Sequence, residues 1–420
     1  MKLPEEILDV LEGNFFKVST DTRVGVSGTV FFALKGENFD GSTFISQALS
    51  SGAILAVTQN KEVHGEKVIY VDDVLGALQE VAKIYRSKFD IPILAIGGSN
   101  GKTTTRELVK LVLATKYKVH SSVGNLNNHI GLPISILSMD PKVEIGIFEI
   151  GANHPGEHLE LLKILKPTHV LVTNNGLDHL EGFGSPSGVR SANKEIYDWA
   201  RENGAKALVN ESHIDQMEDS EELERTLYGG KDLEITSSYP LSIKFADKEF
   251  ITQLAGDYNL ENIYSALACG LEFGVECGVA LGAISKYLPD AKRSQLLKLG
   301  GNDFILDCYN ANPSSMSLSL ESFSKAKFPK KGVVLGDMLE LGSYSGTEHK
   351  KIVGSLQNSD FEVFIFIGPE FKKALSSVNL IYQWFPDSEE AREWFRNQDF
   401  SGFTFLLKGS RGMRVERVVE

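Results

Sequence analysis

From residue 91 onward, short apolar runs alternate with segments whose apolar residues recur at helical spacing. This alternation is typical of a parallel sheet covered by helices, because both faces of such strands are buried. The apolar runs predict strands at Ile93–Ile96, Ile145–Ile150, Val170–Thr173, Ala207–Val209, Ile305–Cys308, Val333–Leu335, Val363–Ile367 and Phe403–Leu407. The segments between them predict helices at Glu157–Leu165, Gly188–Glu202, Asn259–Phe273 and Thr347–Leu356.

Two breaks in this pattern predict domain boundaries. A long helix, Val74–Lys88, gives way to a strand start marked by proline near Phe89–Pro92, and the segment PDAKR interrupts the pattern near Leu288–Arg293. We therefore expect a small N-terminal α/β domain, a central domain of nucleotide-binding type and a C-terminal α/β domain. Their predicted ranges are 1–89, 90–290 and 291–420.

Length and composition fit this division. A chain of 420 residues exceeds what one hydrophobic core usually supports. Its formal charge of -13 makes a nucleic-acid partner unexpected, because no basic stripe is available to neutralise a phosphate backbone. A phosphate-bearing ligand must instead be met by local groups.

The sequence also bears on the compartment. Cys269, Cys277 and Cys308 form no CxxC pair, which fits a reducing environment. Ile7, Leu8 and Leu11 share one helical face near the start, which indicates a surface helix and not a signal sequence. No apolar run approaches the ~20 residues that span a bilayer. We expect a soluble, cytoplasmic protein without membrane insertion.

The segment ILAIGGSNGKTTT, at residues 93–105, carries the first chemical signal. A buried strand leads into a glycine turn, whose amides can approach phosphate oxygens, and a helix then begins near Lys102. Lys102 supplies a charge for the β and γ phosphates, and Thr103 offers a hydroxyl to Mg²⁺. Ile96 stands where the strict phosphate-loop pattern has glycine, and a lone GK[ST] tripeptide would more often be an ordinary turn. The surrounding strand and helix favour the nucleotide interpretation.

Polar clusters follow several predicted strands of the central part. They are GNLNNHIGLP at 124–133, EIGANHPGEH at 149–158 and NNGLDHLEGFG at 174–184. Ligands of open parallel sheets bind at the carboxyl ends of strands, so these clusters are expected beside the phosphate loop. Glu149 and His179 are the best metal candidates, although each alone could be a helix cap or an ordinary loop residue. Lys194 reads as a surface lysine.

The C-terminal part repeats this arrangement with ILDCYNANPSSM, VVLGDMLELG and LLKGSRGM at its strand ends. Asn, Asp, Gly and Pro are what turns require in any case. Turns do not require Lys408 and Arg411 together after an apolar strand.

Taken together, these motifs resemble the Mur ligases over essentially the whole chain. STDTR and VFFALKGENFDGSTF resemble the N-terminal UDP-binding domain of that family. GGSNGKTTTRE, GNLNNHIGLP, EIGANHPGE and DHLEGFGS resemble its central P-loop domain, and DCYNANPSSM, LGDMLELG and LKGSRGM its Rossmann-like C-terminal ligase domain. The resemblance is strongest to the branch that adds D-alanyl-D-alanine.

The resemblance implies an ATP- and Mg²⁺-dependent reaction. ATP would phosphorylate the terminal carboxylate of UDP-N-acetylmuramoyl-tripeptide, and the amine of D-alanyl-D-alanine would attack the acyl phosphate. Lys102, Glu149, His179 and Lys194 would be catalytic, with Thr103, Glu149, His179 and a carbamylated Lys194 serving the metal. We expect a monomer.

The resemblance also assigns binding residues. Those expected at the nucleotide are Gly98, Ser99, Asn100, Gly101, Lys102, Thr103, Thr104, Asn262, Arg293 and Asp307. Of these, Asn262, Arg293 and Asp307 match positions for adenine, phosphate and ribose. Those expected at the other substrates are Ser19, Thr20, Phe39, Asp40, Gly41, Asn127, Asn128, Asn310, Asn312, Lys408 and Arg411.

Some positions depart from the family pattern. Gly97 replaces a threonine, Asn175 and Asp178 replace Ile and Ala, and Lys292 replaces the glycine before Arg293. None removes a charge that the chemistry needs. The alternatives are a folylpolyglutamate-type ligase, for which FALKGENFDG has no place, a non-catalytic P-loop switch, and a degenerate scaffold.

Overall fold

The computed structural model describes residues 3–14, 16–230, 233–289 and 293–420. The chain forms two compact units. The first comprises Met1–Ala95, Tyr117–Ala152 and Gly156–His169, and the second Ile96–Lys116, Asn153–Pro155 and Val170–Glu420. Lys292 and the predicted boundary at 290/291 lie outside the described residues.

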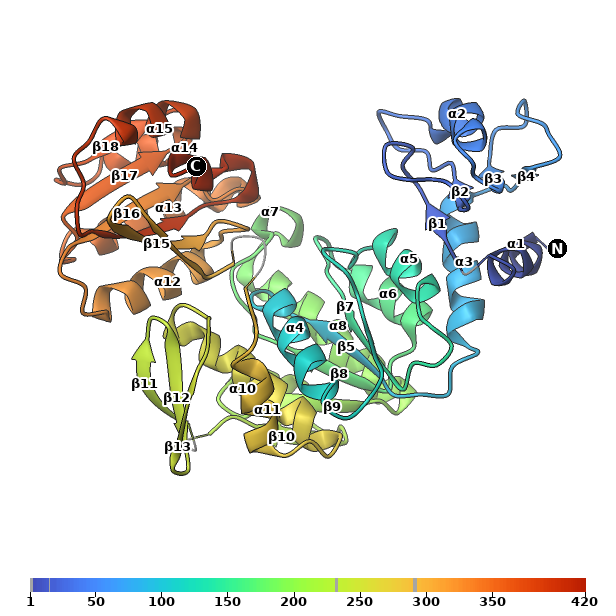
Figure 1. The fold of residues 1–420 in the computed structure, drawn as a ribbon, viewed down its shortest axis with the longest axis horizontal. Helices are drawn as coiled ribbons and strands as arrows, with labels where there is room; N and C mark the ends of the chain where they lie inside the picture. The colour runs from blue at the N-terminus through green and yellow to red at the C-terminus, as the bar shows by residue number, and fades with distance from the viewer. Residues whose placement is uncertain (1–2, 15, 231–232, 290–292) are drawn as a thin grey trace. The chain divides into compact units, whose positions relative to one another are not determined.

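Across the described residues, the strands form four sheets (Figure 1). The N-terminal sheet is parallel, in the order β1–β2–β3–β4. Its strands are Val18–Ser19 (β1), Val30–Phe32 (β2), Leu55–Thr58 (β3) and Val68–Tyr70 (β4). The helices of this part are α1 (Leu3–Glu12), η1 (Gly41–Phe44), α2 (Ile45–Ser50) and α3 (Val74–Arg86). Strands β2 and β3 are fully buried but have only three and four residues, and β1 and β4 are half-buried, so this sheet gave little signal in the sequence.

The central sheet has the order β10–β9–β8–β5–β7–β6. Its strands are β5 (Ile93–Gly97), β6 (Val119–Ser121), β7 (Ile145–Glu149), β8 (His169–Val172), β9 (Lys206–Asn210) and β10 (Arg225–Tyr228). Its helices are α4 (Lys102–Leu113), α5 (Gly131–Leu137), α6 (Glu157–Leu165), α7 (Leu180–Phe183), α8 (Pro186–Asn203), α9 (Ile214–Asp219), η2 (Asp257–Asn259), α10 (Leu260–Glu272) and α11 (Cys277–Ile284). The predicted strands and helices in this stretch are confirmed to within two residues at each end.

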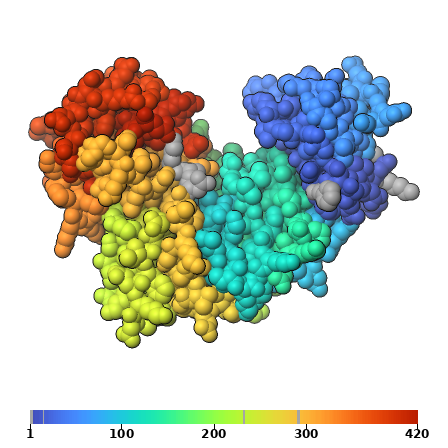
Figure 2. All heavy atoms as spheres, viewed as in Figure 1, coloured from blue at the N-terminus to red at the C-terminus, as the bar shows by residue number. Residues whose placement is uncertain are grey.

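A separate antiparallel sheet, β11–β12–β13, interrupts this pattern. Its strands are Glu234–Ser238 (β11), Leu241–Phe245 (β12) and Lys248–Ile251 (β13). No strand was predicted in this segment, because β11 and β13 are largely exposed and contain no buried apolar run. The sheet packs on the C-terminal part, where Tyr239 Oη donates to Ser322 Oγ at 3.0 Å. In Figure 2 its yellow-green atoms abut the orange ones.

The C-terminal sheet has the order β14–β15–β19–β16–β17–β18, with β14 antiparallel to β15. Its strands are β14 (Gln295–Leu299), β15 (Asn302–Asp307), β16 (Lys331–Gly336), β17 (Val363–Ile367), β18 (Gln383–Phe385) and β19 (Thr404–Lys408). Its helices are α12 (Pro313–Lys325), η3 (Gly342–Tyr344), α13 (Ser345–Leu356), α14 (Pro369–Leu375), α15 (Ser388–Arg396), η4 (Arg411–Met413) and η5 (Val415–Val418). Helices α12 and α15 cover opposite faces, as Figure 1 shows.

The four C-terminal strands predicted from apolar runs are β15, β16, β17 and β19, and all four are present. In this doubly wound α/β arrangement, the loops after β15, β16 and β19 carry the polar motifs. Within the described part of the chain, no helix combines the length and apolar character of a bilayer span.

Candidate functional site

Two glycines shape the loop after β5. Gly98 and Gly101 have φ angles of +109° and +80°, a region that residues with side chains rarely adopt. A Cβ on Gly98 would lie 2.4 Å from Thr173 Oγ1, and one on Gly101 would lie 2.2 Å from Asn262 Oδ1. The loop therefore turns tightly into α4, which begins at Lys102.

Asn174, which follows β8, holds this loop. Its carbonyl accepts from Ser99 N at 2.9 Å, and its side-chain Oδ1 accepts from Asn100 N at 3.1 Å. Its Nδ2 donates back to Asn100 O at 3.0 Å. Sequence reasoning gave Asn174 no role, and its position in the NNG cluster after a strand was the one signal available.

The ammonium of Lys102 lies inside the curve of the loop. Its Nζ donates to the carbonyls of Gly98 and Ser99 at 2.5 and 3.1 Å. Thr103 and Thr104 follow in the first turn of α4, whose amino end carries partial positive charge. Loop, ammonium and helix end together suit the phosphate chain of a nucleotide.

Asn262, on α10, packs against the loop at Gly101 and against the first turn of α4. Its Oδ1 accepts from Thr105 Oγ1 at 3.1 Å, and its Nδ2 donates to Asn259 Oδ1 at 2.9 Å. Both ends of this buried amide therefore contact protein groups. The predicted contact with adenine stays a prediction.

Three loops of the second unit meet at Asn100. Its Oδ1 accepts from Asn312 Nδ2 at 2.8 Å. Close by, Leu177 N donates to Ser314 Oγ at 2.8 Å. Asn312 also caps α12 through a capping box with Ser315. The phosphate loop is thus joined to the loop after β15, a link that the sequence did not reveal.

Two predicted ligand residues of the C-terminal part pair with each other. Asp307 and Lys408 stand opposite one another on the parallel strands β15 and β19. Lys408 Nζ lies 2.5 Å from Asp307 Oδ2, and its side chain is 3% exposed. An unpaired lysine at this depth would be costly, so Asp307 neutralises it.

Tyr309 brings two arginines together just beyond this pair. The guanidinium of Arg293 lies 3.4 Å from the ring centroid, and that of Arg411 lies 5.4 Å from it. Tyr309 thereby fixes two cations at one strand end. Its neighbour Asn310 is exposed, and its side chain accepts from Ala311 N.

His179 lies at the start of α7 and contacts the loop after β16. Its Nδ1 lies 2.7 Å from Glu340 Oε2. The hydrogen bond from His179 lowers the pKa of the Glu340 carboxyl below its usual value. Glu340 appeared in the sequence only as part of a polar strand-end motif, with no partner assigned.

Lys194 lies on α8 and is partly exposed. Its Nζ lies 2.5 Å from Asp198 Oδ1, which also accepts from Arg201 at 2.7 Å. The structure thus gives this lysine a local carboxylate partner one helical turn away.

The first unit holds the remaining central residues. Glu149 ends β7, is 3% exposed, and accepts from Asn127 Nδ2 at 2.8 Å. Asn128 Oδ1 accepts from the backbone N–H of Gly131, the first residue of α5, at 2.9 Å. Glu149 and Asn127 are therefore brought together, as the sequence motifs suggested.

Three of the N-terminal residues predicted to bind substrate, Phe39, Asp40 and Gly41, follow one another just before or at the start of η1. Gly41 N donates to Leu34 O at 2.8 Å, and a Cβ on Gly41 would lie 2.5 Å from that oxygen. Asp40 caps η1, and the hydrogen bond from Ser42 lowers the pKa of its carboxyl. The ring of Phe39 is 56% exposed beside it. The other two predicted residues, at the end of β1 and just after it, are Ser19 and Thr20.

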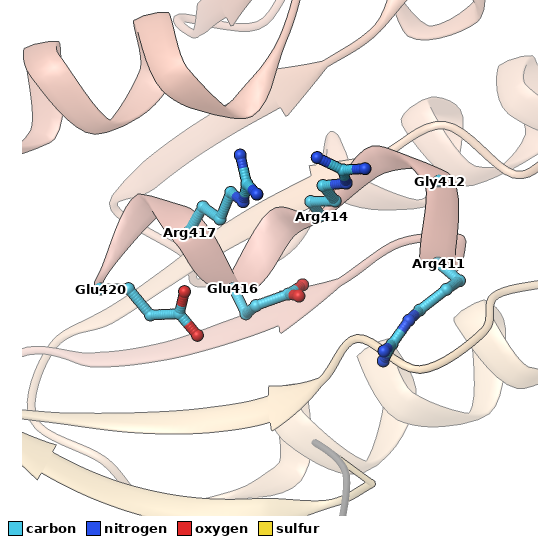
Figure 3. Close-up of a pocket in the computed structure, with 6 residues that line it drawn as sticks. All are labelled: Arg411, Gly412, Arg414, Glu416, Arg417 and Glu420. Atoms are coloured by element: carbon cyan, nitrogen blue, oxygen red, sulfur yellow. The ribbon is translucent and has the colours of Figure 1, made fainter. Parts of the chain in front are cut away.

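Figure 3 shows a pocket of about 470 Å³ near the carboxyl end of the chain. It is lined by Arg411, Gly412, Arg414, Glu416, Arg417 and Glu420. Arg411 points away from the other two arginines, and Arg417 is ion-paired with Glu389 at 2.6 Å. Three arginine and two glutamate side chains line the pocket, and it contains none of the predicted site residues other than Arg411.

The fold and these loops define an α/β protein whose glycine loop, after β5, suits the phosphate chain of a nucleotide. Three family models match the chain. Residues 17–86 match the model described as "Mur ligase family, catalytic domain", residues 96–270 match "Mur ligase middle domain", and residues 292–411 match "Mur ligase, glutamate ligase domain". The chain belongs to the Mur ligase family.

Two kinds of relative show how far the likeness extends. The chain is 31% identical over 424 residues to the UDP-N-acetylmuramoyl-tripeptide–D-alanyl-D-alanine ligase of Bacillus subtilis, covering 96% of this chain and 92% of the relative. A crystal structure of MurF from Acinetobacter baumannii aligns with a TM-score of 0.85 at 28% identity, covering 96% and 92%. MurF ligase from Thermotoga maritima in complex with ADP aligns with a TM-score of 0.82 at 28% identity, covering 96% and 97%.

Proposed function

We propose that this chain is an ATP-dependent ligase that joins D-alanyl-D-alanine to UDP-N-acetylmuramoyl-tripeptide. The product is the UDP-linked pentapeptide precursor of peptidoglycan. The observation that carries the proposal is the full-length likeness to the Bacillus subtilis ligase of that name. The phosphate loop and the loop after β15, joined by Asn100 and Asn312, supply the physical basis.

The reaction proceeds in two steps. A carboxylate oxygen of the tripeptide attacks the γ-phosphorus of ATP, the bond to the ADP oxygen breaks, and an acyl phosphate forms. The amine of D-alanyl-D-alanine then attacks the acyl carbon, and the tetrahedral intermediate expels phosphate with the C–O electron pair while nitrogen loses its proton. Phosphoryl transfer needs positioning and charge neutralisation more than covalent assistance.

Lys102 and the loop amides hold the phosphate chain in this account. Residues 98–104 surround the β and γ phosphates, and the Lys102 ammonium neutralises charge that develops on them. Arg293 contacts phosphate, Asp307 the ribose and Asn262 the adenine. The two cations on Tyr309 support the phosphate role of Arg293, because each brings a permanent charge to the strand end.

The donor atoms suit a magnesium ion. Thr103 offers a hydroxyl, Glu149 a carboxylate and His179 an imidazole. Among the described residues no group of three carboxylate, histidine or cysteine side chains forms a complete cage. Mg²⁺ is commonly bound through one or two carboxylates and completes its shell with phosphates and water, so a set with one carboxylate, a hydroxyl and an imidazole fits it. When bound, the ion supplies positive charge against the transferring phosphoryl group.

Lys194 serves the metal site after carbamylation in this proposal. The ammonium first loses a proton to solvent, and the neutral amine then adds CO₂ and loses a second proton. The cation thereby becomes a carbamate anion, which a magnesium ion favours. The nearby Arg201 would then offset part of the negative charge of Asp198 and the carbamate.

The remaining residues bind the other substrates. Ser19, Thr20, Asp40 and Gly41 contact the UDP part, and the exposed ring of Phe39 offers a face for the uracil. Asn127, Asn128, Asn310, Asn312, Lys408 and Arg411 bind the peptide part and D-alanyl-D-alanine. We assign UDP binding to residues 1–89, ATP binding to 90–290 and completion of the ligase site to 291–420.

We place the protein in the cytoplasm as a monomer. Within the described residues, Cys269, Cys277 and Cys308 form no disulfide, which suits a reducing compartment. Both ATP and UDP-linked precursors are compatible with that location.

A product assay with a matched variant tests the proposal. Wild-type protein with ATP, Mg²⁺, UDP-N-acetylmuramoyl-tripeptide and D-alanyl-D-alanine should yield the pentapeptide mass. Lys102→Ala should raise the activation free energy by about 3 kcal/mol or more, because one preorganised charge is removed. Its turnover should therefore fall by more than about a hundredfold. Lys110→Ala, on the exposed side of α4, is the control and should behave as wild type.

Near-normal turnover by Lys102→Ala would contradict the assignment of the loop. A product only with folate and glutamate would favour the folylpolyglutamate-type alternative.

A further inference from the structure

Glu340 and His179 join two loops that lie far apart in the sequence but within the second unit. His179 Nδ1 lies 2.7 Å from Glu340 Oε2. Beside this contact, Glu181 N donates to Glu340 O at 3.0 Å. The same junction is therefore made twice, through side chains and through backbone.

Both partners adopt an uncommon backbone conformation. His179 has a φ of 44° and Glu340 a φ of 62°, in the left-handed region. Residues with side chains occupy this region only where the surrounding structure holds them there. The ring of His179 also meets the edge of Phe183, with centroids 6.4 Å apart. The imidazole is thus fixed on more than one side.

The contact determines which ring nitrogen of His179 carries a proton. An ionised carboxylate only accepts hydrogen bonds, so Nδ1 must be the donor to Glu340. In a neutral imidazole protonated at Nδ1, the other nitrogen, Nε2, carries no proton and can donate its lone pair to a metal ion. The ring has no second polar partner among the described residues. Its Nε2 is therefore available as a ligand atom.

We propose that Glu340 is a positioning residue that fixes the tautomer and orientation of His179, so that Nε2 is presented to the magnesium–nucleotide complex. This inference rests on the proposed function, in which His179 is a metal ligand. Histidines that bind metals usually donate their other N–H to a carboxylate or carbonyl. Glu340 follows β16 in the C-terminal part, and His179 precedes α7 in the central part. A residue of the C-terminal part therefore orients a metal ligand of the central part.

A spectroscopic measurement tests the contact directly. Long-range ¹H–¹⁵N spectra of the full chain, labelled at histidine, report the tautomer of each ring, and His179→Asn identifies the signal among the nine histidines. In wild type, neutral His179 should be protonated at Nδ1. In Glu340→Ala it should change to the Nε2-protonated form that free neutral histidine prefers. Glu340→Gln keeps an oxygen acceptor and should retain the Nδ1 tautomer.

Metal binding supplies the second readout. Mn²⁺ is titrated by electron paramagnetic resonance in the presence of ADP. Loss of such a partner typically weakens metal binding about ten- to a hundredfold, so we expect this for Glu340→Ala and a smaller loss for Glu340→Gln. Glu181→Gln removes an exposed charge from the same junction and is the matched control. It should leave both tautomer and Mn²⁺ affinity unchanged.

The two readouts separate this inference from the proposed function. Glu340→Ala with wild-type tautomer and wild-type Mn²⁺ affinity overturns the positioning role, even if wild type forms pentapeptide. A changed tautomer with weakened Mn²⁺ binding supports it, even if no pentapeptide forms, and the missing product would then reject the ligase proposal alone. A changed tautomer without any change in Mn²⁺ affinity also overturns the inference, because the orientation of His179 would not serve the metal.

Discussion

At the residue scale, the ion pair of Lys408 with Asp307 and the hydrogen bond of Asn312 to Asn100 join the carboxyl ends of β15 and β19 and the loops that follow β5 and β15. Lys408 and Asp307 were assigned separate ligands, and the structure pairs them across β19 and β15. Their pairing follows from strand register, which depends on the whole sheet. The same holds for Asn312, whose cap could be predicted from NPSS but whose bond to Asn100 spans 212 positions of the chain.

Lys194 provides a prediction at this scale. Lys194→Ala should lower kcat about ten- to a hundredfold, in the range for groups that support a metal ligand shell. Short-chain carboxylates such as acetate or propionate should restore part of the activity, because they can replace the missing anion. The measurement is initial rate against carboxylate concentration.

Lys163→Ala, an exposed lysine on α6, is the control for nonspecific effects of the added anion. Full activity of Lys194→Ala without carboxylate would return Lys194 to the role of a surface lysine held by Asp198.

At the element scale, buried apolar runs made most of the central and C-terminal strands predictable. β5, β7 and β16 are buried along their whole length, so the sequence marks them clearly. β1 has only two residues, and β11 alternates weakly on an exposed surface, so neither could be distinguished from a loop. The element ends that carry the site were predictable where glycine or asparagine follows such a buried run.

The amino end of α12 gives a prediction that separates stability from binding. Asn312→Ala removes the helix cap and should lower the free energy of unfolding by about 1 kcal/mol. It also removes the bond to Asn100 and should weaken nucleotide binding by about 1 kcal/mol, about fivefold. Chemical denaturation and calorimetric titration of ADP measure the two effects.

Asn312→Ser is the matched variant, because serine caps a helix but is too short to reach Asn100. It should keep the stability to within a few tenths of a kcal/mol and still bind ADP about fivefold more weakly. Equal loss of stability in both variants, with unchanged ADP affinity, would show that the Asn100 contact does not support the phosphate loop.

At the scale of the whole molecule, an acyl phosphate must be kept from water, because hydrolysis would waste ATP. We therefore expect the protein to become more compact when both an ATP analogue and UDP-N-acetylmuramoyl-tripeptide are bound. Small-angle scattering should show a smaller radius of gyration with both ligands than with either alone, and its forward intensity should correspond to a monomer of 46.2 kDa. Superimposable profiles in all states would argue against closure.

The central claim is that phosphate release is tied to amide formation on a UDP-linked peptide. Release of inorganic phosphate from ATP should be measured with UDP-N-acetylmuramoyl-tripeptide, in the presence and absence of D-alanyl-D-alanine. We expect sustained release, one phosphate per pentapeptide formed, only when both substrates are present. Steady release from ATP alone, unaffected by either substrate, would contradict it and identify a nucleotide hydrolase or switch instead.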